Sequence, residues 1–255
     1  MKWITAGVIG ALAFAVSGCV STGSTAESPA DPERASQINL DLAVDYLRRG
    51  NLAQAKEKLD RALDQDSRNA AAHSVAGLLY ERLGESDKAD SHYQRAVSLD
   101  GDNSEYKNNY AVFLCQKNRF ERGEKLALQA AQNRLYKTPE MAYVNAGMCA
   151  RNGGDLAAAE KHFRQALAVS PRFAEALFQL ADIEHEQKNY MSARAFLERY
   201  MEVGRTTPAS LWLGVRIERG LGNTAVAQHY AQRLKREYPN ANQTRALVES
   251  ERNPG

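Results

Sequence analysis

One spacing recurs along most of this chain and limits what it can fold into. Alanines that each follow a polar turn stand 34, 70, 34 and 34 residues apart, at Ala55, Ala89, Ala159, Ala193 and Ala227. A glycine or lysine five residues earlier closes each turn, and the gap of 70 corresponds to two periods with two inserted residues. A period of this length is typical of stacked repeats, each too small to bury a core alone.

The period and the residue types resemble the tetratricopeptide repeat, in which small residues mark the point where two helices cross closely. A small residue recurs in the middle of the expected first helix, at Ala43, Gly77, Ala111, Gly147, Ala181 and Gly214. A large one follows the alanine of the second helix by four positions, at Leu59, Tyr93, Phe163 and Leu197. No alternating apolar run indicates a strand. We expect an all-α fold, a right-handed superhelix of six tetratricopeptide (helix-turn-helix) repeats.

The pattern also divides the chain. We expect a lipoprotein signal peptide at 1–18, a lipidated flexible tether at 19–35, the repeat domain at 36–245 and a C-terminal tail at 246–255. The repeats are expected at about 36–69, 70–103, 104–137, 140–173, 174–207 and 208–241. The third repeat is degenerate, because Gly123 stands where the other repeats have alanine.

The N-terminus predicts a secretory signal. A basic start, Met1-Lys2, precedes an apolar stretch at 3–16 that is too short to span a bilayer as a mature helix. The sequence that ends this stretch, Val-Ser-Gly before Cys19, resembles the bacterial lipobox, so we expect Cys19 to carry the lipid. The alternative is an ordinary cysteine near a conventional cleavage site, which would leave an exposed thiol in an oxidising compartment.

The residues after Cys19 predict where the protein is anchored. Acyl chains on the cysteine would make the anchor permanent. Val20 occupies the position where an aspartate would mark inner-membrane retention, so the outer membrane is favoured. The segment 21–31, rich in Ser and Thr, has no apolar cluster and predicts a flexible tether. The chain carries a net charge of only +2 and no basic stripe, so we expect no nucleic-acid partner.

Residue patterns that support catalysis or metal binding are absent from the sequence. It has no nucleophile elbow, phosphate-binding loop or zinc motif. His92 and His162 share a repeat position that we expect on a solvated flank, and His73 and His185 have no ligand-spaced partner. We therefore predict no enzyme activity, no catalytic residue, no metal site and no cofactor apart from the covalent lipid on Cys19.

Two further cysteines, Cys115 and Cys149, lie on the first helices of repeats three and four. First helices of adjacent repeats are neighbours, and the expected compartment permits disulfides. The alternative is a pair of buried reduced thiols. We favour a bridge, which would contribute roughly 3 to 4 kcal/mol and join the degenerate third repeat to the fourth across the inserted loop 135–139.

The first helices of such repeats line the inner face, which is the usual peptide groove. The inward positions that we expect to form a partner-binding groove are Leu40, Val44, Leu47, Leu78, Val112, Met148 and Phe178. This lining is apolar and lacks the Lys-Asn-Arg set that clamps a C-terminal carboxylate in chaperone-binding relatives. It therefore favours an apolar or amphipathic partner segment. Several of these residues could instead be covered by a neighbouring helix.

With the lipobox, six repeats, NNYAVFLCQ at 108–116 and LYKTPE at 135–140, the whole chain resembles the type IV pilus biogenesis and stability lipoproteins known as PilF or PilW. This family includes pilotins of the pilus secretin. The resemblance implies an outer-membrane lipoprotein that faces the periplasm, binds the secretin subunit and promotes its localisation and multimerisation. It implies the lipoprotein sorting machinery as a second partner, and we expect a monomer. The alternative is a general periplasmic scaffold of another envelope complex, for outer-membrane protein assembly or cell-wall synthesis.

Overall fold

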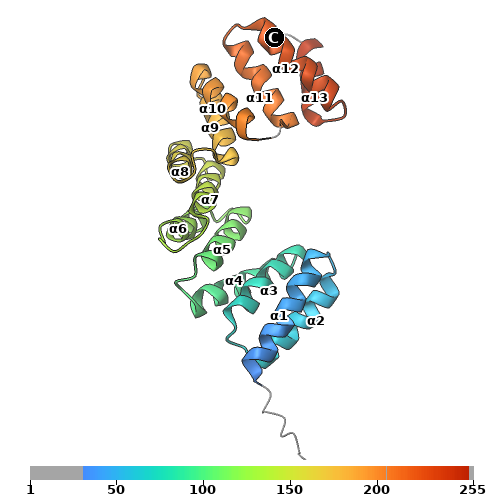
Figure 1. Ribbon diagram of the computed structural model, residues 1–255, viewed down its shortest axis with the longest axis vertical. Helices are drawn as coiled ribbons and strands as arrows, with labels where there is room; N and C mark the ends of the chain where they lie inside the picture. Colours follow the sequence, from blue (N-terminus) through green and yellow to red (C-terminus); the bar gives the residue numbers. More distant parts are fainter. Residues whose placement is uncertain (1–30, 205, 253–255) are drawn as a thin grey trace, which may run out of the picture. The chain divides into compact units, whose positions relative to one another are not determined.

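The computed structural model describes residues 31–204 and 206–252, and within them every regular element is an α-helix (Figure 1). The helices are α1 Pro32–Arg48, α2 Leu52–Gln65, α3 Ala70–Arg82, α4 Ser86–Leu99, α5 Ser104–Gln116, α6 Phe120–Ala131, α7 Pro139–Asn152, α8 Leu156–Val169, α9 Ala174–Glu186, α10 Tyr190–Val203, α11 Pro208–Gly220, α12 Thr224–Glu237 and α13 Asn242–Arg252. The predicted all-helical repeat fold is confirmed. The signal peptide and most of the tether lie outside the described residues.

Six tight turns pair the first twelve helices, and each turn holds one residue in the left-handed backbone region. These residues are Gly50, Gly84, Asn118, Gly154, Lys188 and Gly222, with φ between 60° and 90°. Their spacing of 34, 34, 36, 34 and 34 residues sets the repeat length. Glycine occupies four of the six because it alone adopts this conformation without a steric penalty. The third turn has Asn118 in place of the glycine, and it precedes Gly123, which replaces the alanine as predicted.

Within a repeat, a small residue on the first helix faces a large one on the second. A β-carbon placed on Gly77 would lie 2.6–2.8 Å from ring atoms of Tyr93, and one on Gly147 would lie 2.6–2.9 Å from the ring of Phe163. These distances are too short for any side chain, so the aromatic ring requires the glycine. The two periodic positions noted in the sequence are therefore one packing contact, repeated along the domain.

The core changes where repeat three meets repeat four. One large apolar cluster extends from Leu40 to Leu114, and another from Val144 to Ile217. Between them, α5, α6 and α7 meet through small clusters of buried alanines: Ala111, Ala127 and Ala146 in one, and Ala130, Ala131 and Ala142 in the other. The loop that follows α6, residues 132–138, is longer than the four-residue connections between the other repeats. At this junction the buried side chains are small, so α6 and α7 pack closely against each other.

Both ends of the domain extend beyond the predicted boundaries. Helix α1 begins at Pro32, so residues 32–35 of the expected tether are helical; Ser36 is fully buried and accepts a hydrogen bond from Asn69 Nδ2 at 2.9 Å. At the other end, residues 246–252 of the expected tail belong to α13. Leu247 is fully buried against α11 and α12, because the last repeat of a stack must cover its exposed apolar face.

None of the helices among the described residues combines the length and the apolar character needed to cross a bilayer.

Candidate functional site

A groove of about 690 Å³ runs across the first helices of repeats one to three. Five of the seven predicted groove residues line it: Leu40, Val44 and Leu47 of α1, Leu78 of α3 and Val112 of α5. Tyr106 of α5 and Tyr93 of α4 contribute aromatic surface. The structure therefore brings together, from three repeats, apolar side chains that are far apart in the sequence.

The five residues differ in how accessible they are. Leu40 and Leu47 are each only 4% exposed and belong to the core of the first repeats, so they form the floor of the groove. Leu78 is 37% exposed, and Val44 and Val112 are half-buried. Neighbouring helices therefore cover Leu40 and Leu47, which is the alternative to a role in partner binding. The accessible apolar surface is provided by Val44, Leu78 and Val112.

Polar side chains of the groove wall are paired within the protein. Tyr93 donates its hydroxyl hydrogen to Glu81 Oε2 at 3.0 Å, and burial, with the negative charge of Glu81, raises the pKa of Tyr93. Arg82 Nη1 donates to the backbone carbonyl of Leu47 at 2.8 Å. Because these groups are already satisfied, the wall is suited to hold an apolar surface in place.

The other two predicted groove residues, Met148 and Phe178, lie outside this groove, and here the structure differs from the prediction. Met148 packs partly buried against the core of repeats four to six. The ring of Phe178 packs against Tyr200 of α10, with centroids 5.4 Å apart. Both side chains are partly buried, and Phe178 packs against the second helix of its own repeat.

Charged side chains occupy the inner face of repeats four to six, on the first helices, two of which also carry Met148 and Phe178. Arg151 Nη2 of α7 lies 2.7 Å from Asp182 Oδ2 of α9 and also pairs with Glu186. Arg216 of α11 contacts the other oxygen of Asp182 at 3.2 Å. Although burial alone would lower it, the pKa of Arg151 is raised by its hydrogen bond to Asp182 and by Glu186. These charges compensate one another across three repeats.

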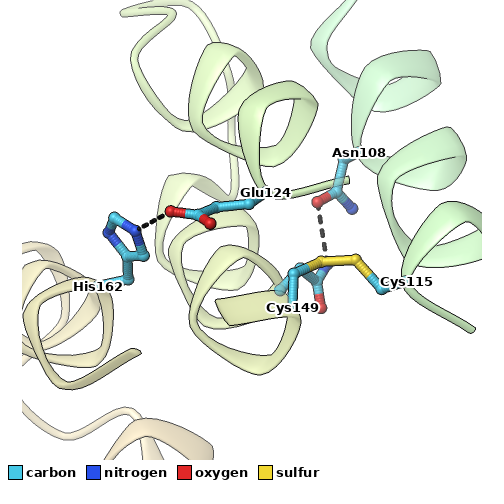
Figure 2. Close-up of a disulfide and its surroundings, with 6 residues drawn as sticks. Asn108, Cys115, Glu124, Cys149 and His162 are labelled. Carbon is cyan, nitrogen blue, oxygen red and sulfur yellow. Dashed lines mark hydrogen bonds and ion pairs between the residues drawn. A yellow bond between two sulfur atoms is a disulfide. The ribbon is translucent and has the colours of Figure 1, made fainter. Parts of the chain in front are cut away.

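Cys115 of α5 and Cys149 of α7 form a disulfide bond with Cα atoms 5.3 Å apart, which confirms the predicted bridge over two reduced thiols (Figure 2). The bond also explains the degenerate third repeat. A β-carbon on Gly123 would lie 2.9 Å from the carbonyl oxygen of Ala111, 3.2 Å from Cys149 Sγ and closer still to Cys115 Sγ. The disulfide therefore fills the space that the alanine side chain occupies in the other repeats.

The histidines do not follow the prediction. His162 is 5% exposed, with Nε2 2.8 Å from Glu124 Oε1 of α6, so it is buried and not on a solvated flank (Figure 2). His73 is not isolated, because its Nδ1 lies 3.0 Å from Nδ1 of His92. His162 thus contacts the second helix of the neighbouring repeat, whereas His73 of α3 and His92 of α4 meet within one repeat.

The sequence also predicts that the protein has no metal site and that Cys19 is lipidated. In the described part of the chain, no group of three or more His, Cys, Asp or Glu side chains is arranged to hold a metal ion. Cys19, the predicted lipidation site, lies outside the described residues.

Comparison with known proteins agrees with the fold. A family model described as tetratricopeptide repeat matches residues 40–104 and 76–140, and a second with the same description matches residues 153–213. The type IV pilus assembly protein PilF of Pseudomonas aeruginosa is 29% identical over 238 residues, which cover 92% of this chain and 94% of PilF.

Two solved structures are similar over most of their length. The P. aeruginosa PilF structure has a TM-score of 0.76 and 27% identity, covering 86% of this chain and 99% of PilF. The structure of PilW, described as a widely conserved type IV pilus biogenesis factor, has a TM-score of 0.77 and 29% identity, covering 84% of this chain and 98% of PilW. With six helix pairs, their periodic packing contact and the matching family models, this chain belongs to the tetratricopeptide-repeat family.

Proposed function

We propose that this chain is an outer-membrane lipoprotein that binds the type IV pilus secretin subunit through its repeats and promotes its localisation and multimerisation, and hence pilus biogenesis. The observation that carries the proposal is the apolar groove of repeats one to three, in a chain similar to PilF over 92% of its length. The protein would act by binding and not by catalysis.

The groove suggests how the partner is held. Val44, Leu78 and Val112 come from three successive repeats and form a row of apolar contacts above a buried floor. An amphipathic or extended segment would bury its own apolar side chains on this row, which is favourable by about 25 cal/mol per Å² of apolar surface removed from water. Because polar side chains of the wall are already paired, binding would not require breaking them.

The lipid on Cys19 would anchor the protein in the outer membrane. With Cys19 acylated, the lipoprotein sorting machinery would carry the protein, with the captured secretin subunit, to the outer membrane, where the repeats face the periplasm. Co-transport of this kind would place secretin subunits at the membrane in which they assemble.

The direct test is a pulldown from detergent-solubilised envelope, with secretin enrichment as the measurement. We expect Leu78→Asp to lower secretin capture by about tenfold or more, because a carboxylate would lose its hydration against apolar surface. Met191→Asp is the matched control, since Met191 is 66% exposed on α10 and away from the groove. Both variants should keep the helical circular dichroism of the wild type.

Equal secretin capture by the two variants would remove the groove from the proposal. Enrichment of another envelope complex in place of the secretin would favour the alternative scaffold function.

A second test concerns delivery. We expect Cys19→Ser to give a folded periplasmic protein and a sharp decrease of secretin multimers in the outer membrane. Normal multimer levels in that variant would refute co-transport.

A further inference from the structure

A second hollow, of about 780 Å³, lies next to the groove at the inserted loop between repeats three and four. It is lined by the connection between α4 and α5, the start of α5, the inserted loop and the start of α7, with Asp102, Glu105, Asn133, Leu135, Lys137 and Met141 among its residues. Glu105 and Asn109 line both this hollow and the groove. The two depressions therefore form one continuous surface along the first helices.

The inserted loop is held in place above the hollow. Asn133 Nδ2 donates to Ser104 Oγ at 2.9 Å and to the carbonyl of Asp102 at 3.2 Å, and Asn133 Oδ1 accepts from the backbone N–H of Leu135 at 3.0 Å. Leu135 is 89% exposed and Met141 is 42% exposed, and both line the hollow. A fixed loop thus presents an apolar side chain to solvent at the edge of a depression, which is typical of an interaction surface.

The hollow is acidic. Asp100, Asp102 and Glu105 contribute three carboxylates, against one ammonium group from Lys137. Burial, together with the negative charges of Asp100 and Glu105, raises the pKa of Tyr106, which lines the neighbouring groove. Asp102 and Glu105 are exposed, so this surface attracts a cation with a strength that salt screens.

Amide side chains lie between the two depressions. Asn109 is half-buried on their shared wall, and Asn108 is 8% exposed, with its Oδ1 accepting from Asn145 Nδ2 at 2.9 Å. An asparagine amide both donates and accepts, which suits it to pair with the N–H and C=O of an extended backbone.

We propose that the acidic hollow binds a basic stretch of extended peptide that continues from the apolar segment held in the groove. A Lys or Arg of the partner would pair with Asp102 and Glu105, and an adjacent apolar side chain would pack on Leu135. The inference rests on the proposed function, since it assigns both depressions to one secretin segment and adds the sequence pattern that this segment must carry: apolar residues followed or preceded by a basic one.

The charge of the hollow argues against the chain's own N-terminal segment as the occupant. Residues 19–31 contain Glu27 and Asp31 and no Lys or Arg, so they carry the same sign as the hollow. A partner with basic residues is therefore favoured over the tether.

The test uses overlapping 20-residue peptides that tile the periplasmic part of the pilus secretin, with binding to the full-length protein in detergent measured by fluorescence polarisation. We expect the tightest peptide to contain both apolar and basic residues. The double variant Asp102→Asn, Glu105→Gln should weaken its binding about five- to tenfold at low salt and remove most of the salt dependence. Replacing the basic residue of the peptide with alanine should cause the same loss in the wild type and little further loss in the double variant.

A second variant tests the loop. Leu135→Ser should weaken the same peptide about threefold or more and leave the melting temperature unchanged, because this side chain is almost fully exposed. Met191→Ser, at another exposed apolar position, is the control.

The outcomes separate the two proposals. Loss of binding in Leu78→Asp together with wild-type binding in the loop and carboxylate variants would overturn the acidic subsite and leave the groove intact. Failure of every secretin peptide to bind the wild type would overturn both. Competition by a peptide of residues 20–31, or a dimer in light scattering that Leu135→Ser converts to a monomer, would assign the hollow to the tether or to a second copy and overturn the inference.

Discussion

The first three repeats and the last two carry different surfaces on the same backbone. One position on the first helix, counted by the repeat spacing, holds Val44, Leu78, Val112, Met148, Asp182 and Arg216 in order. In repeats one to three this position is apolar and lines an open groove. In repeat four it holds Met148, which packs against the core outside the groove, and in repeats five and six it carries opposite charges that pair with each other. Binding capacity in a repeat array thus depends on the side chain at this position and on what packs against it more than on the fold.

The paired half has a further property that the open half lacks. Arg151, from the fourth repeat, reaches Asp182 and Glu186, so its charges are satisfied inside the protein. A partner could use them only by separating ions that are partly buried, which is unfavourable. The comparison therefore assigns recognition to the first half and rigidity to the second.

The largest expected effect concerns the bond that joins the halves. Removing the disulfide in Cys115→Ala, Cys149→Ala should lower the free energy of unfolding by about 3 to 4 kcal/mol, because the bridge closes a loop of 34 residues. Because α6 and α7 pack closely even without the bridge, we expect one urea transition at a lower midpoint. Wild type in reducing agent should behave in the same way. A single transition at the wild-type midpoint would contradict this role.

The next effect tests the rigid half. Arg151→Ala leaves Glu186 without its cation and Asp182 with Arg216 alone, and should lower the free energy of unfolding by about 2 kcal/mol, measured by urea titration. Secretin capture should stay at the wild-type level, because Arg151 lies outside the groove. Arg151→Lys, which keeps the charge but not the planar geometry, should recover part of the stability. If Arg151→Ala lowered secretin capture and left the free energy of unfolding unchanged, the assignment of recognition to the first half alone would be wrong.

The third effect should depend on the state of the cysteines. In the bridged protein, Gly123→Ala should destabilise by roughly 1 to 2 kcal/mol, because the new methyl group overlaps the disulfide. In the Cys115→Ala, Cys149→Ala background the same change should cost less, because only the overlap with the carbonyl oxygen of Ala111 at 2.9 Å remains, and alanine favours a helix more than glycine does. Thermal melts of the four proteins give both values. An equal loss in both backgrounds would show that the bridge does not determine this residue.

The smallest effect is a pH dependence in the second repeat. Burial lowers the pKa values of His73 and His92, so the folded protein binds fewer protons there than the unfolded chain. Stability contributed by the neutral rings is present above the unfolded pKa, near 6.5, and is lost as the pH falls below it. His92→Gln should make the fall in stability between about pH 7 and pH 5 smaller. His229→Gln is the control, and an equal slope in both variants would exclude the pair as the cause.

Much of the fold follows from the sequence, because one packing contact repeats along it. Each alanine or glycine pattern marks a helix crossing, and five groove residues follow from counting inward positions. The remaining features depend on contacts that no period describes. His162 contacts Glu124 from another repeat, Phe178 packs against Tyr200, and α13 forms after the last repeat ends.

The glycine beneath the disulfide also restricts the order in which this domain could have evolved. An ancestral third repeat with alanine at position 123 would have had no room for the two sulfur atoms beside it. The change to glycine must therefore have come first, or together with the cysteines, in any lineage that acquired the bridge. Once the bridge exists, reversion of the glycine is disfavoured, so these three sites are expected to be gained and lost together.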